Sequence, residues 1–155
     1  MQDGQWTVTL ETDPDISLRE KILEPLVAYN ESAAGPGKWG PLAITVRDPG
    51  GEVVGGLWGW TGYGFLFVEL LAAGPARGHG HGRRLMELAE AEAKRRGLLG
   101  MWLDTWTFQA PGFYQKLGFV ECGRITEYPA GHDRIFYVKR FHVSESMREI
   151  GPNGA

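Results

Sequence analysis

The chain has 155 residues, a formal net charge of −3, 43% hydrophobic residues and 23 glycines. This length and hydrophobic content predict one domain spanning residues 1–155 and exclude a disordered chain, and the acidic balance argues against a nucleic-acid partner. The single Cys122 excludes an intramolecular disulfide and a cysteine-built metal site, and the lack of a signal peptide or of an apolar run of roughly 18 residues predicts a cytoplasmic protein without a membrane partner.

The first half of the chain has the pattern of a strand, a helix and an antiparallel meander. Alternating β-branched residues predict the strand, Asp15 or Ser17 can cap the helix, and Gly- and Pro-containing turns separate the later strands. The predicted elements are a strand at 6–10, a helix ending near residue 30, and strands at 42–47, 52–60 and 65–71. Gly55, Gly56 and Gly59 fall inside the strand at 52–60, where glycine is costly, so they indicate a bulge or a place where substrate passes close to the backbone.

The second half alternates helices and strands and ends in a polar segment. It predicts a helix at 83–96, a strand at 99–106, a short helix at 110–117, strands at 119–122 and 135–138, and a polar tail at 143–155. Gly97 and Gly118 stand where the two helices end. The whole pattern is β-α-β-β-β-α-β-α-β-β, an α/β fold with a mixed, largely antiparallel sheet flanked by helices and a core spanning about residues 5–141.

A glycine-rich loop precedes the helix at 83–96. Its sequence is Arg77-Gly78-His79-Gly80-His81-Gly82-Arg83. Glycines at alternate positions leave backbone N–H groups open to an anion, and the start of the helix adds unpaired donors and its positive dipole end. The loop therefore predicts a pyrophosphate cradle, with a tight turn that binds nothing as the alternative. It lacks the Lys-Ser or Lys-Thr of a P-loop, and Arg83 stands where the dinucleotide pattern needs glycine.

Two motifs in this half resemble those of the GNAT family of N-acetyltransferases. Arg77-Gly78-x-Gly80-x-Gly82 is similar to the family's R/Q-x-x-G-x-G/A signature, and the segment 110–119, with its Phe113-Tyr114 pair, is similar to a second family motif. The segments 103–110 and 128–132 resemble a bacterial subgroup of unassigned substrate.

The resemblance implies the GNAT fold and acetyl-CoA as co-substrate. Thr107 stands where many members of the family have an Asn that contacts the pantetheine arm. The resemblance implies that the cofactor contacts Leu70, Leu71, Ala72, Arg77, Gly78, His79, Gly80, His81, Gly82, Arg83, Thr107, Phe113 and Lys116. The register of residues 70–74 against the family stays open, because the strand before the loop is a residue shorter than usual.

The resemblance also implies that a substrate amine attacks the thioester directly, with Tyr114 protonating the departing thiolate. A phenol is still protonated at neutral pH, which suits this role. The alternative is an aromatic side chain that only packs beneath the helix.

A general base must take a proton from the amine. Glu69 is the first candidate, because it is the only charge in an apolar strand, where a carboxylate is expected to be desolvated. An exposed strand face is the alternative for Glu69. Asp104 on the next strand is the second candidate and His132 the third.

These observations predict an enzyme that transfers an acetyl group from acetyl-CoA to a primary amine of a small molecule or peptide. The alternatives are another acyl-CoA or acceptor, or a CoA-binding module without turnover. No metal is expected, because the pair His79 and His81 has no third ligand at useful spacing. An exposed sheet edge would permit a homodimer.

Overall fold

The computed structural model describes residues 4, 6–75 and 78–142. It divides into two compact units, Met1–Gly37 and Lys38–Ala155. The predicted contact of Arg77 and the predicted polar tail at 143–155 lie outside the described residues. The prediction of a single domain stays a prediction.

The first unit contains one helix, α1 (Ile16–Ala34). Asp15 caps it as predicted, because the Ser17 backbone N–H donates to Asp15 Oδ1 at 2.8 Å. The helix ends at Gly35, whose φ of +78° breaks the helical path. The predicted strand at residues 6–10 is wrong, since these residues form no strand. Alternation alone does not make a strand, which also needs a neighbouring strand for its backbone hydrogen bonds.

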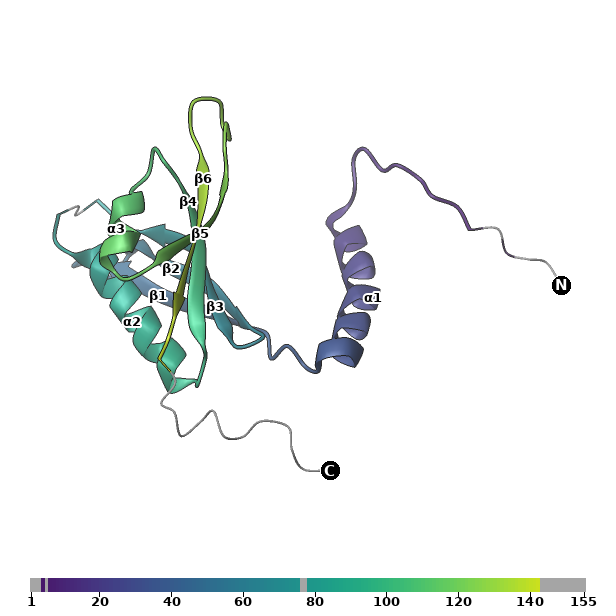
Figure 1. Cartoon of the computed structure of the whole chain (residues 1–155), viewed down its shortest axis with the longest axis horizontal. Helices are drawn as coiled ribbons and strands as arrows, with labels where there is room; N and C mark the ends of the chain where they lie inside the picture. The colour runs from purple at the N-terminus through teal and green to yellow at the C-terminus, as the bar shows by residue number, and fades with distance from the viewer. Residues whose placement is uncertain (1–3, 5, 76–77, 143–155) are drawn as a thin grey trace. The chain divides into compact units, whose positions relative to one another are not determined.

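The second unit is a six-stranded sheet with two helices (Figure 1). Its elements are β1 (Gly40–Arg47), β2 (Val53–Gly62), β3 (Phe65–Ala72), α2 (His81–Arg95), β4 (Gly100–Trp106), α3 (Pro111–Lys116), β5 (Val120–Ile125) and β6 (Arg134–Arg140). The strand order is β1-β2-β3-β4-β6-β5, and only β3 and β4 run parallel. This confirms the mixed, largely antiparallel sheet, with α2 as the crossover between its parallel strands.

The core lies between the sheet and α2, which runs along one sheet face in Figure 1. The amphipathic spacing of α2 gives it an apolar stripe, formed by Leu85, Met86, Ala89 and Ala93. This stripe belongs to the same buried cluster as alternate residues of the central strands, which are Leu57, Leu66, Val68, Met101 and Leu103. Because side chains alternate along a strand, the intervening residues of these strands lie on the opposite face of the sheet.

The glycines inside β2 have a structural explanation. A Cβ at Gly55 would lie 2.6 Å from the Ala72 carbonyl oxygen, and one at Gly59 would lie 2.5 Å from the Phe67 carbonyl oxygen. A Cβ at Gly56 would collide with the Ile44 carbonyl oxygen. These positions require glycine because neighbouring backbone comes too close for a side chain.

A bulge accompanies these glycines. Trp58 pairs with Leu70 and Gly59 with Val68, so Glu69 is an extra residue in β3.

Candidate active site

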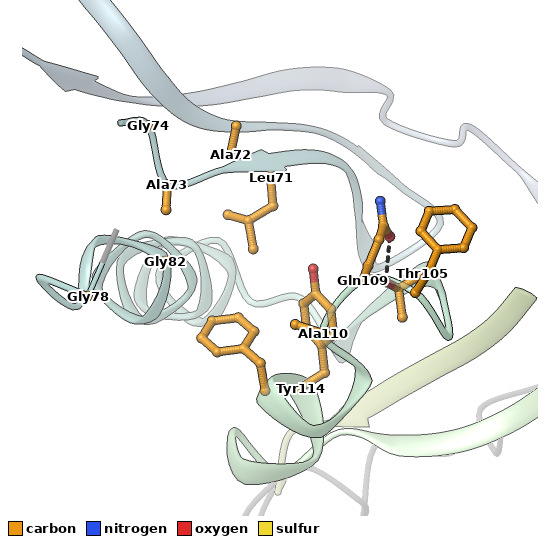
Figure 2. A pocket seen from close by; sticks show the side chains of 12 residues that line it. Leu71, Ala72, Ala73, Gly74, Gly78, Gly82, Thr105, Gln109, Ala110 and Tyr114 are labelled. Carbon is orange, nitrogen blue, oxygen red and sulfur yellow. Dashed lines mark hydrogen bonds between the residues drawn. The ribbon is translucent and has the colours of Figure 1, made fainter. Parts of the chain in front are cut away.

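The candidate site begins where β3 and β4 separate. They pair only from Phe65 with Gly100 to Val68 with Leu103. Beyond that point, β3 continues beside β2 to Ala72, and β4 continues beside β6 to Trp106. A cleft of about 710 Å³ lies at this end of the strands (Figure 2). Its lining consists of Leu71, Ala72, Ala73, Gly74, Gly78, Gly82, Thr105, Phe108, Gln109, Ala110, Phe113 and Tyr114.

One wall of the cleft is formed by the glycine loop and the start of α2. Gly80 is the N-cap of α2, has a φ of +74° and provides no side chain to cap the helix. The first turn of α2 carries no acidic residue, and its first backbone hydrogen bond runs from the Arg84 N–H to the Gly80 carbonyl. The helix dipole and the N–H groups at this end can therefore hold an anion.

The histidine at the start of α2 has an atom without a hydrogen-bond partner in the part of the chain that the structure describes. Within the described residues, His81 Nδ1 is buried and has no hydrogen-bond partner. A buried polar atom of this kind is costly unless a ligand or water satisfies it. Because His81 does not line the cleft, the fit to the pyrophosphate of acetyl-CoA rests on Gly78, Gly82 and the uncapped start of α2.

The predicted cofactor contacts divide into two groups. Leu71, Ala72, Gly78, Gly82 and Phe113 line the cleft. The others that the structure describes do not, and these are Leu70, His79, Gly80, His81, Arg83, Thr107 and Lys116. On β3 and the residues after it, Leu71, Ala72, Ala73 and Gly74 line the cleft, and the register of residues 70–74 against the family stays open.

Three of the residues outside the lining have other surroundings. Leu70 is 62% exposed. Arg83 Nε forms an ion pair with Glu87 at 3.0 Å. Thr107 Oγ1 accepts a hydrogen bond from the Asp133 backbone N–H at 3.1 Å, which ties the end of β4 to the loop before β6.

Tyr114 projects from α3 into the cleft, and Figure 2 shows its hydroxyl directed toward Leu71. Its ring is partly buried and lies against the rings of Phe113, Phe119 and Tyr137. Burial, followed by the negative charge of Asp104, raises the pKa of the Tyr114 phenol above its ordinary value. The hydroxyl therefore remains a proton donor well above neutral pH.

Asp104 lies on β4 with its side chain only 11% exposed. Arg134 of β6 donates to Asp104 Oδ1 from both Nε at 2.8 Å and Nη2 at 2.7 Å. The Arg134 guanidinium also lies over the rings of Trp106, Tyr128 and Phe136, at 4.9, 5.7 and 5.6 Å from their centroids. A carboxylate held in this way has little freedom to accept a proton from a substrate.

Glu69 occupies the bulge of β3, at the point where β3 leaves β4. The predicted desolvated setting is wrong, because Glu69 is exposed, and the alternative of an exposed face is confirmed. The bulge inserts Glu69 beyond the last residue of β3 paired with β4, so no neighbour on that side covers it. Trp60 Nε1 donates to Glu69 Oε2 at 2.9 Å and orients the carboxylate.

The sequence did not single out Thr105, Phe108 or Gln109 as site residues. Thr105 is buried, and its hydroxyl donates to Gln109 Oε1 at 2.6 Å. The Trp106 backbone N–H donates to the same oxygen at 3.2 Å, so the amide nitrogen of Gln109 points away from this contact, as Figure 2 shows. The available signal was their position at the end of a buried strand, Thr105 within β4 and Phe108 and Gln109 just after it. His132 is exposed beside this segment, with its ring 5.1 Å from that of Phe108.

Among the described residues, no three His, Cys, Asp or Glu side chains are grouped so that they could hold a metal ion. The rings of His79 and His81 lie 6.0 Å apart. The described helices include none long and apolar enough to cross a membrane. The cytoplasmic location and the homodimer stay predictions.

The sequence and the fold of this chain are similar to those of known acetyltransferases. The model of the Acetyltransferase (GNAT) family matches residues 7–119. The chain is 37% identical over 128 residues to Acetyltransferase Atu2258 of Agrobacterium fabrum, covering 82% of this chain and 93% of the relative. It is 46% identical over 91 residues to Blasticidin-S acetyltransferase of Streptomyces morookaense, covering 57% of this chain and 67% of that protein. The fold matches the crystal structure of a protein from Agrobacterium tumefaciens that is assigned to the acetyltransferases. The TM-score is 0.83 and the sequence identity is 35%, and the match covers 88% of this chain and all of that chain.

Proposed function

The chain belongs to the GNAT family of acetyltransferases, and we propose that it transfers the acetyl group of acetyl-CoA to a primary amine, with Tyr114 as the general acid. The observation that carries this proposal is the Tyr114 hydroxyl, which enters the same cleft as the open N-terminus of α2. One wall can hold the phosphates, and the other offers a proton.

Acetyl-CoA is a substrate of this reaction and supplies the activated acyl group. Gly78, Gly82 and the first N–H groups of α2 hold its pyrophosphate, and Phe113 and Leu71 border the path of its arm. The acceptor nitrogen forms a bond to the thioester carbon, and the carbon–sulfur bond breaks. Tyr114 donates its proton to the leaving sulfur, and its raised pKa keeps that proton available at neutral pH.

The proton of the attacking amine goes to a carboxylate. Glu69 is the better candidate, because only its Oε2 is engaged and the donor, Trp60, is uncharged. Asp104 is the weaker candidate, because the Arg134 guanidinium already occupies it. Glu69 therefore takes the proton, either directly or through a water molecule.

The test is release of free thiol from acetyl-CoA in the presence of a panel of primary amines, with mass analysis of the products. The panel includes blasticidin S, the compound in the name of one relative. Acetylation of at least one amine supports the proposal, and Glu69→Gln is expected to lower kcat by about 100-fold while the Kd for CoA is unchanged. Tight CoA binding without turnover on any amine would instead identify a binding module. Turnover only with a longer acyl-CoA would identify a different donor.

A further inference from the structure

Glu69 differs from the other acidic residues in the strands. The described strands contain three, Glu69, Asp104 and Glu121. Asp104 forms an ion pair with Arg134, and Glu121 forms one with Arg124 at 2.7 Å. Among the described residues of the second unit, Glu69 forms no ion pair, and its one side-chain partner is the uncharged indole of Trp60. Where β3 separates from β4, β3 thus carries a negative charge that no described cation of this unit neutralises.

Two tryptophans border this carboxylate. Trp58 and Trp60 alternate with the buried residues Leu57, Gly59 and Thr61, so they lie on the sheet face opposite α2. Their rings form an edge-to-face pair with centroids 5.9 Å apart, and they are 38% and 40% exposed. The Trp60 N–H fixes Glu69 beside this pair.

Other aromatic rings in this unit already have cations of the chain over them. Arg134 lies over Trp106, Tyr128 and Phe136, Lys94 over Phe141, and Arg140 over Phe65. Among the described residues of this second unit, no cation lies over Trp58 or Trp60. Two open tryptophans beside an unneutralised carboxylate are the chemistry that binds an ammonium or guanidinium group.

The position of this group agrees with a role toward the acceptor. Glu69 precedes the cleft-lining residues Leu71 and Ala72 on the same strand, where β3 loses its pairing with β4. The N-terminus of α2 attracts anions into the cleft, and Glu69, just before the part of β3 that lines the cleft, attracts cations. The two substrates thus meet surfaces of opposite electrostatic character.

We propose that the acceptor carries a second cationic group besides the amine that is acetylated, and that Trp58 and Trp60 bind this second cation while Glu69 receives the reacting amine. The inference rests on the proposed function and specifies its substrate class, which is a small amine with an additional ammonium or guanidinium group.

The test compares two acceptors of nearly the same shape, agmatine and N-(4-aminobutyl)urea. Both have one primary amine, but the guanidinium of agmatine is charged and the urea is neutral. Thiol release from acetyl-CoA should give a kcat/KM at least about tenfold higher for agmatine, mainly through KM. The preference should shrink as salt is added, because exposed charges are screened.

Variants of Trp60 separate the ring from its N–H group. Trp60→Leu should lower the ratio of kcat/KM for agmatine to kcat/KM for the urea analogue by roughly 3- to 30-fold. The lost N–H contact to Glu69 affects both acceptors alike and cancels in this ratio. Trp60→Phe keeps an aromatic face and should retain most of the preference. Tyr128→Leu is the matched control, since it removes an exposed ring that already faces Arg134, and the ratio between the two acceptors should stay constant.

The outcomes distinguish the two proposals. Equal kcat/KM for agmatine and the urea analogue would overturn the inference and leave the proposed function standing. Failure of every amine to cause thiol release from acetyl-CoA would overturn both proposals. A preference that persists in Trp60→Leu would also overturn the inference, because the charge would then be recognised elsewhere. An unchanged Kd for CoA shows that each variant is folded.

Discussion

The two walls of the cleft are built in different ways. The wall at the start of α2 consists of backbone, where Gly78 and Gly82 line the cleft and Gly80 caps the helix without a side chain, which leaves N–H groups open to a ligand. The wall formed by β4 and α3 consists of side chains, with Tyr114, Thr105 and Gln109 converging on the cleft. A backbone wall recognises a group common to all its ligands, whereas a side-chain wall determines which chemistry takes place. Substitutions on the two walls should therefore separate binding from turnover.

The largest effect is expected for Tyr114→Phe. Loss of the phenol removes the proton donor, so kcat should fall by about 100-fold or more. The Kd for CoA should stay within about twofold, since the ring still packs against Phe113 and Phe119. Rapid-mixing kinetics and calorimetry measure the two quantities, and Tyr128→Phe serves as the control. Undiminished kcat would remove Tyr114 from the mechanism.

A smaller effect, and on binding instead of turnover, is expected for Gly80→Ala. Gly80 has a φ of +74° and open space around its Cα, so the added methyl group strains the backbone without a clash. A left-handed conformation costs a non-glycine residue about 1–2 kcal/mol, which corresponds to roughly 5- to 30-fold in the Kd for CoA if the loop relaxes. Gly112→Ala is the control, because its methyl also meets open space but its φ is not in the left-handed region. Equal Kd values for the two variants would contradict a backbone cradle.

The smallest effect is a shift of the pH profile in Asp104→Asn. The negative charge of Asp104 is the second cause, after burial, of the raised pKa of Tyr114. Its removal lowers that pKa, so the phenol loses its proton at a lower pH and activity on the alkaline side should fall earlier. The alkaline limb of the kcat profile should move down by less than about one pH unit. An unchanged limb would mean that Tyr114 does not titrate in that limb.

The contrast between the backbone wall and the side-chain wall also explains how well each could be predicted from the sequence. The glycine loop is contiguous, and its backbone properties depend on residue type, so residues 77–83 pointed to an anion site before the fold was known. The helix that follows begins at His81, two residues before its predicted start, which does not change that conclusion.

Glu69 shows why other parts were harder to predict. An acidic residue in an apolar run suggested a buried carboxylate, but the bulge opposite Trp58 and Gly59 leaves it exposed. Bulges depend on the register between strands, which no single segment encodes. Likewise, Gln109 enters the site only because β4 ends beside it, and the predicted strand at 6–10 lacked the partner that a strand requires.

The short pairing between β3 and β4 has a consequence for how the protein can change. The cleft lies where the pairing of β3 with β4 ends, so its opening depends on the backbone and not on any one lining side chain. Residues such as Phe108 or Trp58 can therefore be exchanged without closing the opening or displacing the cofactor wall. A fold of this kind can acquire a new acceptor by a few substitutions at the ends of its strands while its donor stays the same.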